Sequence, residues 1–239
     1  MKHILFGVLL FATSATPVFA EPSRKVQFRT LCITQLEGLE KVHIPAGKGA
    51  SKNQEVALYT DISRPIEGVF TSNEAVFYTL KPDPQGKPMR VAVGKTALGK
   101  SARQLFVCAP GSGEGDGKLT YHVLAYDDDE KSFPLGSIRA INLSSEPVRF
   151  VMAGTPIPPI LPGQSTQFPH AKEVNEYNMY PVTVEFQSAS GEWVKGQAAS
   201  WKASDRSREV VVTSGDTKTQ SQAVKIFGDF PPWLEKSKK

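Results

Sequence analysis

The stretch Val182-Thr183-Val184-Glu185-Phe186 alternates apolar and polar side chains. A period of two residues is typical of a β-strand, because successive side chains point to opposite faces of a sheet. The segments 148–152 and 119–123 show the same alternation. This pattern predicts strands that lie with one face against a core and the other toward solvent.

Further candidate strands, such as 74–80, 104–108, 209–213 and 223–227, are more continuously apolar. They are short, rich in Val, Ile, Thr, Phe and Tyr, and bounded by Gly, Pro, Asn, Asp and Ser. No window sustains a 3.6-residue apolar period over three turns, and we expect at most one short helix, over 171–176. Short strands separated by turn signals predict an all-β protein built from antiparallel sandwiches.

A glycine-rich stretch, 109–117, reads APGSGEGDG and is the best candidate for a domain boundary. With a linker at 111–117, the sequence predicts two tandem immunoglobulin-like sandwiches, over 21–110 and 118–230, and a tail over 231–239. Each part has roughly the size of such a domain, about 100 residues. A long hairpin loop within one large sandwich is the alternative interpretation.

The first twenty residues have the features of a signal peptide. A basic start, Met1-Lys2-His3, precedes the apolar run ILFGVLLF and a small-residue end at Ala20. The apolar run is shorter than the roughly 20 residues that span a bilayer, and no later stretch is long and apolar enough. We therefore expect cleavage after Ala20, no transmembrane segment, and a periplasmic or extracellular protein.

A likeness to a known group lies in the second half. The run Ser132-Phe-Pro-Leu-Gly-Ser-Ile-Arg-Ala-Ile-Asn-Leu-Ser144 is followed by Leu161-Pro-Gly163. With these features, 119–227 resembles uncharacterised exported β-proteins of verrucomicrobial-type bacteria. The resemblance implies an exported bacterial β-fold, and it implies no reaction, ligand or site residue.

Cys32 and Cys108 are the only two cysteines, and they lie near the first and last strands of the first half. In an oxidising compartment, paired thiols usually form a disulfide. Closing a loop of this length would contribute about 4 kcal/mol in the chain-entropy model. We predict a Cys32–Cys108 disulfide, with two buried free thiols on neighbouring strands as the alternative.

Trp193 and Trp201 are the candidate ligand-binding residues. They are separated by an even number of positions, so one strand carrying both would place them on the same face. Gly196 between them would permit a β-bulge. Two exposed indoles could stack on sugar rings; the alternative is one tryptophan in the core and one at its rim.

The net charge, the motifs and the spacing of the histidines argue against several functions. The formal net charge of +4 is small and evenly spread, so no nucleic-acid partner is expected. The chain lacks a G-x-S-x-G motif, and His43, His122 and His170 are far apart in sequence. The acidic run 127–130 is expected to form a solvated hairpin turn. No catalytic residue, metal ligand or cofactor is predicted.

The sequence predicts an exported, non-catalytic protein that offers a binding or structural surface in the cell envelope or outside the cell. Its expected partners are a protein or polysaccharide of the envelope. One alternative is a carbohydrate-binding module that uses Trp193 and Trp201. The other is an enzyme whose site combines distant residues, such as His43 or His122 with two carboxylates.

Overall fold

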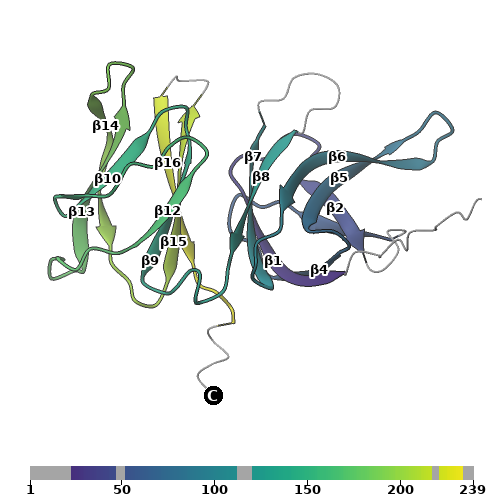
Figure 1. The fold of residues 1–239 in the computed structure, drawn as a ribbon, viewed down its shortest axis with the longest axis horizontal. Helices are drawn as coiled ribbons and strands as arrows, with labels where there is room; N and C mark the ends of the chain where they lie inside the picture. The colour runs from purple at the N-terminus through teal and green to yellow at the C-terminus, as the bar shows by residue number, and fades with distance from the viewer. Residues whose placement is uncertain (1–22, 47–51, 112–119, 217–220, 234–239) are drawn as a thin grey trace, which may run out of the picture.

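The computed structural model describes residues 23–46, 52–111, 120–216 and 221–233, so the predicted signal peptide lies outside them. These residues form β-strands and turns but no helix, which confirms the all-β prediction and corrects the short helix expected over 171–176. The strands are arranged in four sheets of four strands each (Figure 1). Within the described part of the chain, no helix could cross a membrane.

The first half of the chain supplies two sheets, in the orders β4-β1-β7-β8 and β3-β2-β5-β6. Their strands are β1 (Arg24–Cys32), β2 (Lys41–Ala46), β3 (Lys52–Ala57), β4 (Ile66–Phe70), β5 (Glu74–Pro82), β6 (Pro88–Ala97), β7 (Arg103–Pro110) and β8 (Tyr121–Asp127). All the pairings are antiparallel except that β1 lies parallel to β7.

The second half supplies the other two sheets, in the orders β12-β9-β15-β16 and β11-β10-β13-β14. Their strands are β9 (Ser137–Leu143), β10 (Val148–Met152), β11 (Thr155–Pro156), β12 (Ser165–Pro169), β13 (Met179–Gln187), β14 (Trp193–Lys202), β15 (Arg208–Asp216) and β16 (Ser221–Asp229). Here the only parallel pair within the described strands is β9 with β15.

The second half repeats the first strand for strand, because adding eight to each strand number converts one pair of sheets into the other. The parallel pair β1–β7 corresponds to β9–β15. The connections 83–87 and 188–192 are equal in length, and so are 98–102 and 203–207. The clearest departure among the described connections is between β12 and β13, where 170–178 replaces the much shorter 71–73.

Each half encloses its own apolar core between its two sheets. In the first half, Phe28, Phe70, Phe77 and Phe106 form an aromatic cluster with ring centroids 5.2 to 6.4 Å apart. In the second half, Phe150 packs against Phe168 and Trp201 among buried Val, Ile and Met side chains. Alternating inward side chains on opposed sheets are what a β-sandwich requires.

A third apolar core joins the two halves. Nine buried residues form it, from sheets β4-β1-β7-β8 and β12-β9-β15-β16, from the position after β1 and from the connection 128–136: Leu31, Ile33, Leu105, Val107, Ala109, Phe133, Ile141, Val210 and Val212. The two sheets therefore bury both faces, which explains why β7 and β15 are continuously apolar. In Figure 1 the four sheets lie side by side as successive layers.

The predicted linker at 111–117 is wrong as a boundary between the halves. Residues 112–119 lie outside the described part, but the strands on either side, β7 and β8, pair antiparallel in one sheet. The glycine-rich segment thus connects two strands of the first half. The chain passes to the second half after β8, through 128–136.

Four buried charged side chains form ion pairs at the junction between the halves. Arg29 of β1 donates to Asp128 through Nε at 2.8 Å and to Asp229 through Nη1 at 2.5 Å. Arg208 of β15 donates through Nη2 to the same two carboxylates, at 2.6 Å each. All four side chains are at most 3% exposed. Each arginine is therefore held by one carboxylate of the connection between the halves and one of the second half, a geometry that compensates the cost of burial.

The electrostatics of this junction favour the ionised state. Burial would raise the pKa of Asp229, but hydrogen bonds from Arg29 and the positive charges of both arginines outweigh it and hold that pKa below its ordinary value. Burial likewise opposes the charge on Arg29, yet hydrogen bonds to Asp229 and Asp128 leave its pKa raised. The contacts of the junction thus hold both Asp229 and Arg29 in their charged forms.

Two aromatic rings cover the junction. Phe133 lies against Arg139 and Arg208, at 4.3 and 4.2 Å from the ring centroid. Trp233 lies against Arg29, Arg103 and Arg208, at 4.7, 4.9 and 5.7 Å. The segment after β8 therefore covers arginines of the second half, and the segment after β16 covers arginines of both halves. Cation–π contacts of this kind stabilise desolvated guanidinium groups. The beginning of the predicted tail is accordingly docked on the body at Trp233.

Candidate binding face

The outer face of sheet β11-β10-β13-β14 carries Trp193 and adjoins a pocket. Along β13, Tyr180, Val182, Val184 and Phe186 are buried, so the residues between them point away from the core. Register places residues of β10 and β14 beside those outward positions. This face forms one side of the molecule in Figure 1.

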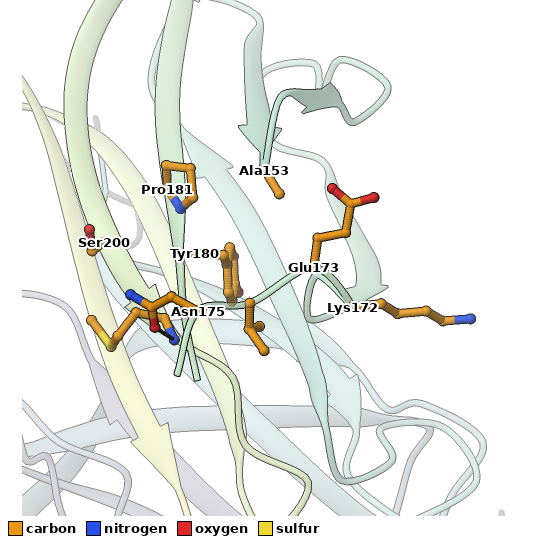
Figure 2. A pocket seen from close by; sticks show the side chains of 9 residues that line it. Ala153, Lys172, Glu173, Asn175, Tyr180, Pro181 and Ser200 are labelled. Carbon is orange, nitrogen blue, oxygen red and sulfur yellow. Dashed lines mark hydrogen bonds between the residues drawn. The ribbon is translucent and has the colours of Figure 1, made fainter. Parts of the chain in front are cut away.

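A hollow of about 660 Å³ lies at one end of this face, and we call it the β13 hollow. It is lined by Ala153, Lys172, Glu173, Val174, Asn175, Met179, Tyr180, Pro181 and Ser200. Figure 2 shows the side chains of Lys172 and Glu173 directed away from the hollow's centre and Tyr180 and Pro181 rising from β13 behind it. The hollow therefore combines an apolar wall with a rim that carries both signs of charge.

The connection 170–178 forms one wall of the hollow and is held by a side-chain turn. The Asn175 side-chain oxygen accepts hydrogen bonds from the backbone N–H groups of Tyr177 and Met179, at 3.0 and 2.9 Å. Asn178 adopts a positive φ of 60°, which asparagine tolerates better than most residues. Asn/Asp side chains that bond the backbone two to four residues on compete with helix formation. This turn explains why the expected helix does not form.

Tyr180 ties the hollow to the interior. Its hydroxyl lies 2.8 Å from Nδ1 of His170, and the Nε2 atom of that histidine has no hydrogen-bond partner among the described residues. Burial raises the pKa of Tyr180, and the nearby Glu209 carboxylate adds to the effect. Burial lowers the pKa of His170. Both groups are therefore neutral near pH 7, and Tyr180 gives the hollow an uncharged floor with His170 beneath it.

Trp193 lies on the same outer face, at the far end from the hollow. The guanidinium of Arg149 lies 4.4 Å from the indole centroid, and its Nε donates to Glu185 at 2.6 Å. The indole is half-buried by this contact. Trp193 is thus a sequence-predicted site residue that reaches the surface, with one side already occupied by an arginine.

The position of Trp201 shows that the predicted tryptophan pair is wrong. It packs in the second-half core against Phe150 and is only 5% exposed. The bulge at Gly196 adds one residue to β14 and reverses the parity, so Trp193 lies opposite Gln187 and Trp201 opposite the buried Tyr180. Trp193 and Trp201 therefore point to opposite faces and cannot form one stacking platform.

Cys32 and Cys108 are brought together but not bonded. They are in-register partners on the parallel strands β1 and β7, and both are buried free thiols, so the predicted disulfide is absent from the structure. The Cys32 thiol is instead directed to the Thr34 carbonyl, at 3.2 Å. Burial raises the pKa of both thiols, which keeps them protonated and poorly nucleophilic.

The acidic run 127–130 is not the solvated turn that we expected. Asp128 is fully buried in the junction, and Asp127 accepts hydrogen bonds from Gln104 and the Ser101 backbone, at 2.9 Å each. Sequence reasoning assigned no role to the other three junction charges. The sequence offers one signal for Arg29 and Arg208. Arg29 lies within an apolar strand and Arg208 stands at the start of another, positions where a charged residue is unusual.

The histidines considered for an enzyme site are dispersed. His43 stacks on Tyr78 on the outer face of the other sandwich, and His122 is exposed on β8. Among the described residues, no group of three or more His, Cys, Asp or Glu side chains could hold a metal ion.

Comparison with known proteins returned no matching family model and no matching curated protein.

The arrangement of the outer face supports recognition of a partner. The β13 hollow and the partly covered indole of Trp193 share this face, and the packed core behind them fixes their separation. Pockets with apolar walls and a few polar groups are typical of ligand recognition.

Proposed function

We propose that the protein is an exported, non-catalytic module that presents a rigid binding surface in the cell envelope or outside the cell. We further propose that it comprises two tandem immunoglobulin-like sandwiches, each of eight strands. The strand-for-strand repeat and the separate core of each half support this division.

One observation carries the proposal of a binding surface: the repeat is broken where the β13 hollow is built. The long connection 170–178 replaces the short 71–73 of the first half, and it supplies Lys172, Val174 and Asn175 to the hollow. Val174 and the neighbouring Tyr177 are 39% and 69% exposed. A long loop held by its own hydrogen bonds over a rigid sheet is a common design for recognition.

The junction supports the same function. Apolar side chains and four paired charges fix the halves against each other. A rigid body loses little conformational freedom on binding, and this lowers the cost of recognition. The proposed partner is a protein or polysaccharide of the envelope that contacts the outer face of β10, β13 and β14.

The carbohydrate alternative is weakened by the positions of the tryptophans. A two-indole platform needs Trp193 and Trp201 on one face, and only Trp193 reaches it. Sugar binding would then depend on one indole that Arg149 already covers on one side.

Photo-crosslinking in the cells that make the protein tests the proposal. A benzophenone amino acid at Val174 is expected to give a discrete adduct on illumination, while the same group at Met89, 49% exposed in the first half, is expected to give none. The intact mass of the mature protein from the envelope fraction should correspond to a chain that begins at Glu21. Identical adducts at both positions, or a cytoplasmic protein that retains residues 1–20, would contradict the proposal.

A further inference from the structure

The two sandwiches differ along one lateral edge. In the first half, β6 and β8 are the terminal strands of their sheets and pack against each other. A side chain at Gly94 of β6 would approach Val123 of β8 to 2.7 Å, and Tyr121 and Val123 are both buried. This edge of the first sandwich is therefore closed by direct packing of β6 against β8.

In the part of the chain that the structure describes, the corresponding edge of the second sandwich, between β14 and β16, is more open. Val194 lies in register with the buried Phe186, so it faces the inner side of its sheet, yet it is 54% exposed. Ile226 lies in register with the buried Val211 and also faces inward, yet it is 43% exposed. Inward-facing apolar side chains that remain exposed indicate a gap here, because β14 and β16 pack together less closely than their counterparts β6 and β8.

The backbone of β14 is available at this gap. Among the described residues, β14 pairs only with β13, and it is the terminal strand of its sheet. It is ten residues long, and a terminal strand presents a row of unpaired N–H and C=O groups. Such an edge can accept an extended peptide as an additional strand.

The charges of β14 specify the partner. Lys195 and Lys202 lie opposite Glu185 and Met179, so they point to the outer face, and both are exposed. The strand itself contains no acidic residue, and the carboxylate of Glu185 is engaged by Arg149. A strand added beside β14 would therefore be stabilised by acidic side chains on its outer face and apolar side chains toward Val194.

We propose that β14 binds an extended peptide, of the partner protein, in which acidic and apolar residues alternate. The inference rests on the proposed function and names the chemistry of the partner. The peptide would pair with the free edge of β14, cover Val194 and Ile226, and place carboxylates near Lys195 and Lys202. A second copy of this chain is disfavoured at this edge, because pairing two β14 strands would bring lysines of like charge together.

The probe is a blocked octapeptide in which glutamate and valine alternate, titrated into the isotope-labelled protein by NMR. Saturable shifts are expected at the amides of β14 and at those flanking Ile226, and none along β6. The Lys195→Glu/Lys202→Glu variant is expected to weaken binding about tenfold or more. The matched Lys87→Glu/Lys100→Glu variant, at exposed first-half lysines, is expected to leave binding unchanged.

Two peptide variants test strand pairing directly. Methylating alternate backbone nitrogens removes the hydrogen-bond donors of one edge only, so one methylated set should abolish binding and the other should retain it. Equal effects of the two sets, equal binding of a lysine–valine peptide, no saturable shift, or β14 shifts that disappear on dilution as a dimer dissociates would each overturn the proposal. A Val174 adduct that persists in those cases would leave the proposed function standing.

Discussion

Replacing Asp229 with alanine removes the acceptor shared by both junction arginines. Its carboxylate receives four hydrogen bonds, two from Arg29 and two from Arg208, at 2.5 to 2.8 Å. The side chain is 1% exposed, so water cannot readily replace it. Among the described residues, the variant retains Asp128 as the only carboxylate paired with the two buried guanidinium groups.

The expected loss of stability follows from the number of buried charges that stay compensated in the variant. Breaking a buried ion pair by removing one partner typically costs 3–5 kcal/mol, because a buried charge is left without compensation. Asp229 compensates two arginines, and Asp128 continues to compensate both. We therefore expect the free energy of unfolding to fall by about 3–5 kcal/mol. The exposed pair Lys25–Glu67 offers a control, and Glu67→Gln should change stability by less than about 0.5 kcal/mol.

Urea denaturation monitored by circular dichroism measures both variants. The pH dependence provides a second test, because the pKa of Asp229 is lowered in the folded protein. Its stabilisation is present above the unfolded value, about 3.9, and is lost as pH falls through the lower folded value. Asp229→Ala should abolish that part of the acid dependence. A loss below about 1 kcal/mol, comparable to a surface pair, would refute the reasoning.

Three further predictions concern the predicted site residues and the hollow's floor. Trp201→Ala should destabilise the protein by about 3–5 kcal/mol, and Trp193→Ala by much less; equal losses by urea denaturation would show that the assignment of faces is wrong. Cys32 and Cys108 should resist iodoacetamide in the native protein and both react in denaturant without reductant; a mass unchanged in denaturant would reveal a disulfide. Because burial lowers the pKa of His170, unfolding free energy should fall as pH drops below about 6.5, where only the unfolded chain gains the proton. His170→Gln should flatten this slope, and an unchanged slope would contradict the burial argument.

Local patterns predicted the strands because alternation and turn residues act over a few positions. The segment 182–186 lies within β13 as expected. The error at 111–117 has a physical origin: glycine-rich composition suits a hairpin loop as well as a linker, and only the pairing of β7 with β8 distinguishes them. The repeat of eight strands left almost no sequence trace, because sheet topology can be preserved while side chains change.

The positions of the site residues depend on a bulge and on long-range contacts, which the periodicity of the sequence does not reveal. A single inserted residue at the Gly196 bulge separates Trp193 from Trp201, although their spacing in the sequence is even. The junction charges come from four distant segments, and nothing local marks Asp128 as buried and its neighbour Glu130 as outside the cluster. Long-range contacts of this kind become visible only when the sheets are assembled.

The central claim is that the two halves form one rigid body through the buried junction. Native-state hydrogen exchange in increasing urea tests it most directly, by comparing the most protected amides of β5 in the first half with those of β13 in the second. A shared core and shared ion pairs predict that both sets exchange through the same global opening, with one free energy and one urea dependence. Two distinct free energies, with the first half opening while the second stays protected, would contradict the claim.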